Sequence, residues 1–298
     1  MPISNILTRL KSRLRSVPTN RPDWIENFKK DAWKSGEAAS RYVVNVGDTE
    51  NLHYFVQTTL YVEKIKAHLI KGHHILDVGC GTGVLTFALH DAGLKVSGMD
   101  ISASMLEQLR GRLDGREIDL HVGDIFNMPF EDSSFDGIAS RWVLPHFPDW
   151  PRVIVEMGRK LRPGGYLFID FCNAENVELS RRAGPIDVGS FGYCHDEADI
   201  ANRGAFYAAA SQAEMHIAAT AAGLKLVEAL PTGFFVNNAA IAAALGGEGY
   251  TAYKDVLKRH YMDPGARAFM EWFERFVSPR LPSPMVHGLC VVMRRPEA

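Results

Sequence analysis

One short stretch of the sequence combines an acid with closely spaced glycines in a way that suits a nucleotide-like ligand. In the run ILDVGCGTGVLTFAL, residues 75–89, an apolar strand pattern ends in Asp77 and is followed by glycines at 79, 81 and 83 and then by a helical pattern. Glycine adopts positive φ without strain and lets a ligand lie directly against the backbone, where a Cβ would collide. The run therefore predicts a backbone loop that holds a nucleotide-like cofactor.

The spacing of the glycines separates this loop from two other cofactor loops. A dinucleotide fold uses the order GxGxxG, whose third glycine would fall at position 84, but that residue is Val84. A phosphate loop needs Gly-Lys-Ser/Thr after its glycines, and no such triplet follows. An acidic residue followed by GxGxG resembles the first motif of the class I S-adenosylmethionine-dependent methyltransferases.

The resemblance to this family covers about residues 73–171. The segments FEDSSFDGIASRWVLPHFPDW and LRPGGYLFID are similar to the fourth-strand and fifth-strand motifs of the family. The resemblance implies S-adenosyl-L-methionine as the cofactor and methyl transfer as the reaction.

Acids at successive strand ends are the acceptors that this cofactor needs. The resemblance implies that Asp77 holds the loop or accepts from the methionine ammonium group, that Asp100 accepts from both ribose hydroxyls, and that Asp124 accepts from the adenine amino group. Asp also commonly caps helices, so each acid has a structural alternative. The predicted cofactor-binding set is Asp77, Gly79, Cys80, Gly81, Gly83, Asp100, Ile101, Met105, Asp124, Ile125 and Arg141.

The methyl acceptor requires a second group of residues. Methyl transfer from a sulfonium depends mainly on in-line positioning, but an alcohol must also lose a proton, and neutral His is the usual base at neutral pH. His146 follows the fourth strand, at the substrate-facing end of the pocket in the resembled family, and is the candidate base. A structural or positioning role is its alternative. Trp142, Tyr193, His195 and Tyr207 are the candidates to line the acceptor pocket, although such residues in loops are more often packed or solvated.

These residues favour O-methylation of a small hydroxylated metabolite by in-line displacement. No acidic trio of the kind that holds a catalytic metal is visible, so we predict no metal. N- and C-methylation stay open, because one fold hosts all three reactions. The alternatives from other classes are a non-catalytic S-adenosylmethionine-binding protein and a nicotinamide oxidoreductase, and the missing GxGxxG argues against the second.

Strands separated by helices surround these motifs, which is typical of a parallel sheet. We expect an α/β fold: a Rossmann-like, doubly wound, seven-stranded and mostly parallel sheet with helices on both faces, an antiparallel last strand, and helical N-terminal and C-terminal additions. A helical insertion separates the last two strand patterns, LKLVEALP and HGLCVVMRR, where the family usually has a simple hairpin. We therefore expect an extra cap there.

The patterns divide the chain into four parts. The segment after the fifth strand lacks periodicity and is too long for an ordinary connection, so we expect it to be functional or mobile. The predicted parts are a cationic amphipathic segment at 1–22, a helical lead-in or lid at 23–72, the cofactor-binding core at 73–171, and the remainder of the core at 172–298, with acceptor-cap insertions at 172–205 and 238–278.

Composition limits the partners and the compartment. A formal net charge of -2 over 298 residues argues against nucleic acid as the main partner. The four cysteines form no CxxC pair, and no apolar run is long enough to span a membrane, so a cytoplasmic location is expected. Residues 1–16 are basic and amphipathic, which fits docking on their own domain, peripheral membrane contact or a cleaved targeting segment. The oligomeric state is left open.

Overall fold

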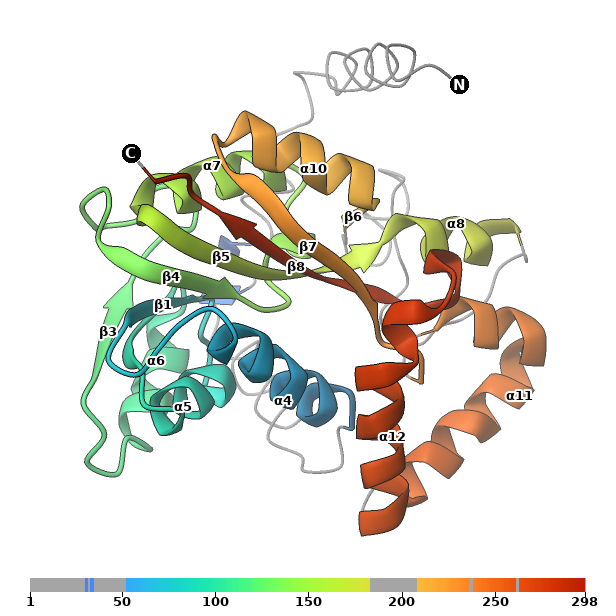
Figure 1. Ribbon diagram of the computed structural model, residues 1–298. Helices are drawn as coiled ribbons and strands as arrows, with labels where there is room; N and C mark the ends of the chain where they lie inside the picture. The colour runs from blue at the N-terminus through green and yellow to red at the C-terminus, as the bar shows by residue number, and fades with distance from the viewer. Residues whose placement is uncertain are drawn as a thin grey trace, which may run out of the picture.

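A mostly parallel sheet runs through the centre of the molecule (Figure 1). The computed structural model describes residues 30–31, 33–34, 52–182, 208–235, 238–260 and 263–297. Seven strands follow one another in the order β3, β2, β1, β4, β5, β8, β7, and the two-residue β6 pairs with β5 off this path. The strands are β1 His74–Val78, β2 Lys95–Asp100, β3 Ile118–Val122, β4 Phe135–Ser140, β5 Leu161–Asn173, β6 Ala209–Ala210, β7 Lys225–Thr232 and β8 Gly288–Arg294.

The strand directions confirm the predicted sheet. Strands β1 to β5 pair in parallel, whereas β8 pairs antiparallel with both β5 and β7. The short β6 is an addition to the seven strands that the sequence predicted. The strand order reverses between β1 and β4, and ligands of such sheets bind in the crevice at the carboxyl ends of the strands near this point.

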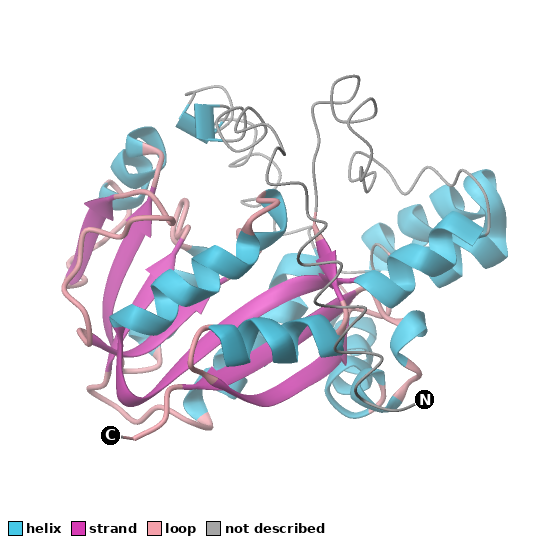
Figure 2. Ribbon diagram, turned by 90° about the horizontal axis from the view of Figure 1, so that it is seen from above, coloured by secondary structure: helices cyan, strands magenta, loops and turns pink. Residues whose placement is uncertain are grey.

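Helices cover both faces of the sheet, as the two views show (Figures 1 and 2). One face carries α4 (Leu52–Lys66), α5 (Val84–Asp91) and α6 (Ala103–Arg110), and the other carries α7 (Trp150–Lys160) and α10 (Gln212–Ala221). Successive strand side chains point to opposite faces, so Ile75 packs in the buried cluster with α4 and α5, and Leu76 in the cluster with α7 and α10. None of the helices that the structure describes is long and apolar enough to cross a membrane.

Two helices stand between β7 and β8 in the sequence, where the helical insertion was predicted. They are α11 (Ala239–His260), which bends at Gly246 with φ of 68°, and α12 (Pro264–Phe276). Short 3-10 turns at Ser278–Arg280 and Ser283–Met285 lead on to β8. The two strands still pair antiparallel along their whole length, so the insertion replaces a hairpin turn without separating them.

The chain directly after the predicted fifth strand is more regular than its sequence indicates. Instead of irregular structure from residue 172, β5 continues to Asn173 and α8 (Ala174–Arg182) follows. The amide of Asn173 donates to the Ser283 carbonyl at 2.7 Å, and the amide of Asn176 donates to the Pro284 carbonyl at 2.7 Å. These partners lie 110 and 108 residues later in the chain, so no local pattern could reveal them.

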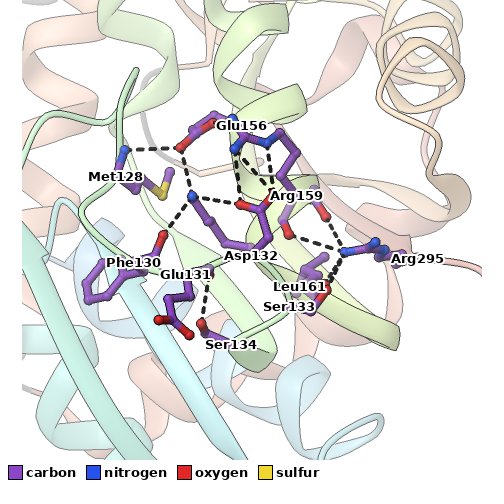
Figure 3. Close-up of polar contacts among 12 residues, drawn as sticks. Met128, Phe130, Glu131, Asp132, Ser133, Ser134, Glu156, Arg159, Leu161 and Arg295 are labelled. Atoms are coloured by element: carbon purple, nitrogen blue, oxygen red, sulfur yellow. Dashed lines mark hydrogen bonds and ion pairs between the residues drawn. The ribbon is translucent and has the colours of Figure 1, made fainter.

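A network of ion pairs joins α7 to the loop before β4, at the amino ends of the strands (Figure 3). The Lys160 ammonium group is buried, donates to Asp132 Oδ1 at 2.9 Å and lies 3.5 Å from Glu156 Oε1. Arg159 contacts the same two carboxylates at 3.1 and 2.8 Å. Arg295, close to the end of the chain, donates to the Leu161 carbonyl beside them. Positive and negative charges therefore meet in pairs at this edge of the sheet.

Candidate functional site

The glycine loop between β1 and α5 needs the glycines that its sequence supplies. Gly79, Gly81 and Gly83 have φ angles of 73°, 53° and 91°. A Cβ on Gly79 would lie 2.2 Å from a methyl carbon of Val143, and one on Gly83 would lie 2.3 Å from a methyl carbon of Leu109. Both the backbone conformation and the close packing therefore exclude other residues at these two positions.

Asp77 ties the start of the loop to the following helix. Its side chain is 1% exposed, and the Thr86 hydroxyl of α5 donates to its carboxylate at 2.7 Å. Burial raises the pKa of the Asp77 carboxyl to about 7, against the lowering effects of the Thr86 hydrogen bond and Arg141. Of the two roles that the resemblance implied, these contacts favour holding the loop.

Asp100, at the end of β2, presents a carboxylate to the same loop. Its Oδ2 accepts from the Gly81 backbone N–H at 2.9 Å, and its Oδ1 accepts from the Ser102 N–H at 2.8 Å. Burial raises the pKa of this carboxyl, while the backbone hydrogen bonds lower it. A carboxylate has about four acceptor sites, so these bonds leave acceptor capacity for a ligand.

Asp124 lies beyond β3, where it meets a cation from the N-terminal part of the chain. Its Oδ1 accepts from the Phe126 N–H at 3.0 Å, and its Oδ2 pairs with the Lys30 ammonium at 2.7 Å. The same ammonium lies 4.6 Å from the centre of the Phe126 ring. An adenine amino group at this carboxylate would share it with Lys30.

Apolar residues line the loop and the ends of β2 and β3. Met105 and Ile125 are buried, and Ile101 is partly exposed. The Cys80 side chain turns into a buried cluster with Leu106 and Leu109, so only its backbone faces the loop. Burial raises the pKa of the Cys80 thiol well above its ordinary value.

A second group of polar residues lies one and two strands further along the same edge. Arg141 follows β4, and its Nε lies 3.7 Å from Oδ2 of Asp170 on β5, while its guanidinium also donates to the Thr58 hydroxyl of α4. Trp142 has a positive φ of 55°, which directs its backbone N–H to Asp170 Oδ1 at 2.5 Å. Its ring stacks on His287 at 5.6 Å between centroids. Positive φ is strained for a bulky residue and often marks functional sites.

Sequence reasoning missed Asp170, although a signal was present. The strand pattern GYLFID ends in this acid, as the patterns before Asp77 and Asp100 end in theirs. Burial raises the pKa of the Asp170 carboxyl to about 7, while Arg141 and the Trp142 N–H lower it. A desolvated acid of this kind at a strand end is a candidate functional group.

A cavity of about 340 Å³ opens beside Asp170, between α4, α12 and the strands β5, β8 and β7. Trp142 and Asp170 line it, together with Leu60, Tyr61 and Leu230. Glu274 holds α12 against the chain after β7 on one side of the cavity, because its carboxylate accepts hydrogen bonds from the Gly233 and Phe234 N–H groups at 2.9 and 2.7 Å.

The other predicted acceptor residues are His146 and three residues outside the part of the chain that the structure describes. His146 is in the 3-10 turn Leu144–His146, is 9% exposed, and meets the Trp33 ring edge to face at 5.3 Å between centroids. It is absent from the residues that line the cavity described above. Tyr193, His195 and Tyr207 lie outside the residues that the structure describes, as do residues 1–22.

The residues of the first group fit S-adenosylmethionine. The glycine loop offers bare backbone, and Asp100 is held in place with acceptor capacity left over. These features stand together at the carboxyl ends of β1 and β2, next to the strand-order reversal. Open parallel sheets bind nucleotide-like ligands at this place.

Known proteins share this core. Residues 76–169 match a family model described as a methyltransferase domain. A demethylmenaquinone methyltransferase of Symbiobacterium thermophilum is 39% identical over 137 residues, which are 43% of this chain and 51% of that protein. A ubiquinone biosynthesis O-methyltransferase of Coxiella burnetii is 30% identical over 148 residues, 49% of this chain and 62% of that protein. The matches thus span about half to three-fifths of the length of these relatives.

Solved structures share the fold over most of the chain. A methyltransferase in complex with the Haloferax volcanii Trm112 activator has a TM-score of 0.57 at 19% identity, over 90% of this chain and 98% of that one. Phosphoethanolamine N-methyltransferase 2 of Haemonchus contortus, in complex with S-adenosyl-L-methionine, has a TM-score of 0.58 at 16% identity, over 90% of this chain and 60% of that one. At these identities the likeness concerns the fold alone.

Proposed function

We propose that this chain, whose core belongs to the class I S-adenosylmethionine-dependent methyltransferases, transfers the methyl group of S-adenosylmethionine to a small-molecule acceptor. The observation that carries the proposal is Asp100, whose carboxylate is held by the Gly81 and Ser102 N–H groups beside a loop of positive-φ glycines. This arrangement suits a ribose lying against bare backbone.

The residues of the first group divide the work of binding the cofactor. Asp100 accepts from the ribose hydroxyls, Asp124 accepts from the adenine amino group alongside Lys30, and Asp77 keeps the loop in position through Thr86. The bound cofactor supplies a methyl carbon that is already activated by a sulfonium. The protein then has to hold the acceptor in line and exclude water.

We assign O-methylation of a hydroxylated metabolite as the reaction. The similarity to a protein named ubiquinone biosynthesis O-methyltransferase supports this choice, and so does a largely apolar cavity with a few polar groups. N- or C-methylation is the alternative within the same chemistry. His146 is the base that the sequence suggests, and a full rate in His146→Ala would exclude that role.

Calorimetry with S-adenosylmethionine, S-adenosylhomocysteine and NAD tests the cofactor. We expect both sulfur compounds to bind and NAD to give no heat. Incubation with labelled S-adenosylmethionine and extracts of the source organism, followed by identification of the labelled compound, tests the reaction. Tight cofactor binding without any labelled product would instead support a non-catalytic binding protein.

A further inference from the structure

The cavity between α4 and α12 is separate from the glycine loop but close to it. Arg141 links the two, because its charge acts on both the Asp77 and the Asp170 carboxyls. Strand β5 lies two strands from β1, which is roughly 10 Å at the usual strand spacing. A molecule in the cavity would therefore have its inner end near the methionine part of a cofactor bound on the loop.

The walls of the cavity define what it can hold. Leu60 of α4, Ala67 just after that helix, Leu230 of β7 and Cys290 of β8 give it largely apolar sides. Its far end reaches the surface at the pair of Glu63 and Arg275, whose shortest N–O distance is 2.5 Å and whose side chains are 48% and 37% exposed. A largely apolar molecule fits such a space, with its polar group at the buried end beside Asp170.

Asp170 is the acceptor group at that buried end. The Trp142 N–H and the Arg141 guanidinium hold its two oxygens, so the carboxylate keeps one orientation. Its charge in turn raises the pKa values of Tyr61 from α4, Cys290 from β8 and Cys172 from β5 itself. Arg141 is the cation that lowers the pKa of Asp170, and the other charged side chains that line the cavity are Glu63, Lys64, Glu274 and Arg275.

We propose that this cavity is the acceptor pocket of the methyl transfer, that it takes an apolar aromatic alcohol, and that Asp170, rather than His146, accepts the proton of that hydroxyl. The inference rests on the proposed function. The apolar walls at Leu60 and Leu230 suit an aromatic ring beside Asp170. Burial raises the pKa of the Asp170 carboxyl to about 7, which favours proton transfer from a phenol, with a pKa near 10, over an aliphatic alcohol with a far higher pKa.

The step balances in atoms and charge. The Asp170 carboxylate takes the hydroxyl proton while the hydroxyl oxygen forms a bond to the methyl carbon. The bond from that carbon to sulfur breaks, and its electron pair stays on sulfur as a neutral thioether. The products are an aryl methyl ether, S-adenosylhomocysteine and protonated Asp170, which returns its proton to solvent.

Binding of 1-naphthol tests the pocket. Calorimetry in the presence of saturating S-adenosylhomocysteine should give a dissociation constant below 1 mM for the wild type and a loss of at least tenfold in Leu230→Trp, which fills the cavity. Val227→Trp is the matched control, because Val227 is on the same strand but is an exposed side chain. Equal binding by Leu230→Trp and the wild type, or no binding by the wild type, would overturn the pocket assignment.

Turnover of 1-naphthol with labelled S-adenosylmethionine tests the base. We expect Asp170→Asn to bind S-adenosylhomocysteine within about twofold of the wild type, to melt as one cooperative unit, and to lose at least a hundredfold in kcat. Wild-type kcat should fall below pH 7, and the residual rate of Asp170→Asn should lack this fall. Full activity of Asp170→Asn, an unchanged pH profile, or a wild type that binds 1-naphthol without methylating it would remove Asp170 from the proton transfer.

Two results separate this inference from the proposed function. If the wild type binds neither S-adenosylmethionine nor S-adenosylhomocysteine, the proposed function itself fails. If the wild type binds both and methylates 1-naphthol, but His146→Ala loses the rate and Asp170→Asn keeps it, the methyltransferase stands and the base is His146.

Discussion

Several acids at the two edges of the central sheet have pKa values that are shifted in opposite directions. At the amino edge, hydrogen bonding to Lys160 lowers the pKa of Asp132. Burial alone would raise the pKa of Asp136, but hydrogen bonds from the His74 N–H and Arg162 lower it. At the carboxyl edge, burial raises the pKa values of Asp77, Asp100 and Asp170.

The difference lies in the partners rather than in the acids. Ion pairs join Asp132 to Lys160 and Asp136 to Arg162, at 2.9 and 2.7 Å. At the other edge, N–H groups and a hydroxyl hold most of the carboxylates of Asp77, Asp100 and Asp170, and Arg141 Nε lies 3.7 Å from Asp170 Oδ2. Asp124 at that edge is the exception, because it pairs with Lys30 at 2.7 Å. The paired charges of the amino edge stabilise the fold. The desolvated acids of the carboxyl edge can still interact with a charged or polar ligand, but their burial lowers the free energy of unfolding.

The largest effect that we expect is on cofactor affinity. Asp100→Asn should weaken S-adenosylhomocysteine binding by about 10- to 100-fold, since a charged hydrogen bond contributes about 1.5–3 kcal/mol. Calorimetry measures this change. The control is Asp136→Asn at the amino edge, which should leave the affinity unchanged. An equal loss in both variants would mean that the two edges do not divide binding from stability.

The amino edge should respond in stability instead. Lys160→Met removes a buried cation from Asp132 and Glu156 and should lower the free energy of unfolding by about 2–3 kcal/mol. Urea unfolding measures it, and S-adenosylhomocysteine affinity should stay within twofold of the wild type. A stability equal to the wild type would show that this network contributes little.

The pH dependence of stability sharpens the contrast. The Asp170 carboxyl has a pKa of about 7 when folded and about 3.9 when unfolded, so between these values the folded state holds the extra proton. Stability therefore falls as pH rises from about 4 to 7. Asp170→Asn lacks this loss.

The difference in unfolding free energy between Asp170→Asn and the wild type should therefore increase by about 2 kcal/mol from about pH 4.5 to about pH 8. The full pKa difference sets an upper limit of roughly 4 kcal/mol on this increase. Urea unfolding at a series of pH values measures the gain. The same difference at every pH would mean that Asp170 titrates normally in the folded protein.

We expect the smallest effect at an exposed ion pair, Glu63 and Arg275. Glu63→Gln breaks the contact between α4 and Arg275 of α12 at the surface. It should lower the free energy of unfolding by less than about 0.5 kcal/mol, because water screens exposed pairs. A loss as large as that of Lys160→Met would show that burial does not set the value of an ion pair here.

The cofactor half of the molecule was predictable because its signals are local. Asp77, the glycines and Asp100 each follow an apolar strand pattern, and parallel strands bring their carboxyl ends to one edge. The mostly parallel sheet and the helical insertion before the last strand followed from the same periodicity. The family resemblance then named the cofactor.

The acceptor half depends on contacts between distant segments. Asp170 carries the same local signal as Asp100, but its neighbours Tyr61 and Cys290 come from α4 and β8, far away in sequence. Lys30 reaches Asp124 across 94 residues. Helix α8 likewise depends on hydrogen bonds that the Asn173 and Asn176 amides donate to carbonyl groups more than a hundred residues later in the chain.

The sequence by itself determined the glycine loop, the order of strands and helices, and the acids at the strand ends, because these follow from backbone conformation and hydrophobic periodicity. Only the tertiary structure decided which acids lose their solvent and which meet a cation. Asp132 and Asp170 are the same residue type, the first in the loop before β4 and the second in the carboxyl-terminal part of the neighbouring β5. Lys160 lowers the pKa of the first, and burial beside a cavity raises that of the second, since desolvation depends on everything packed around a charge.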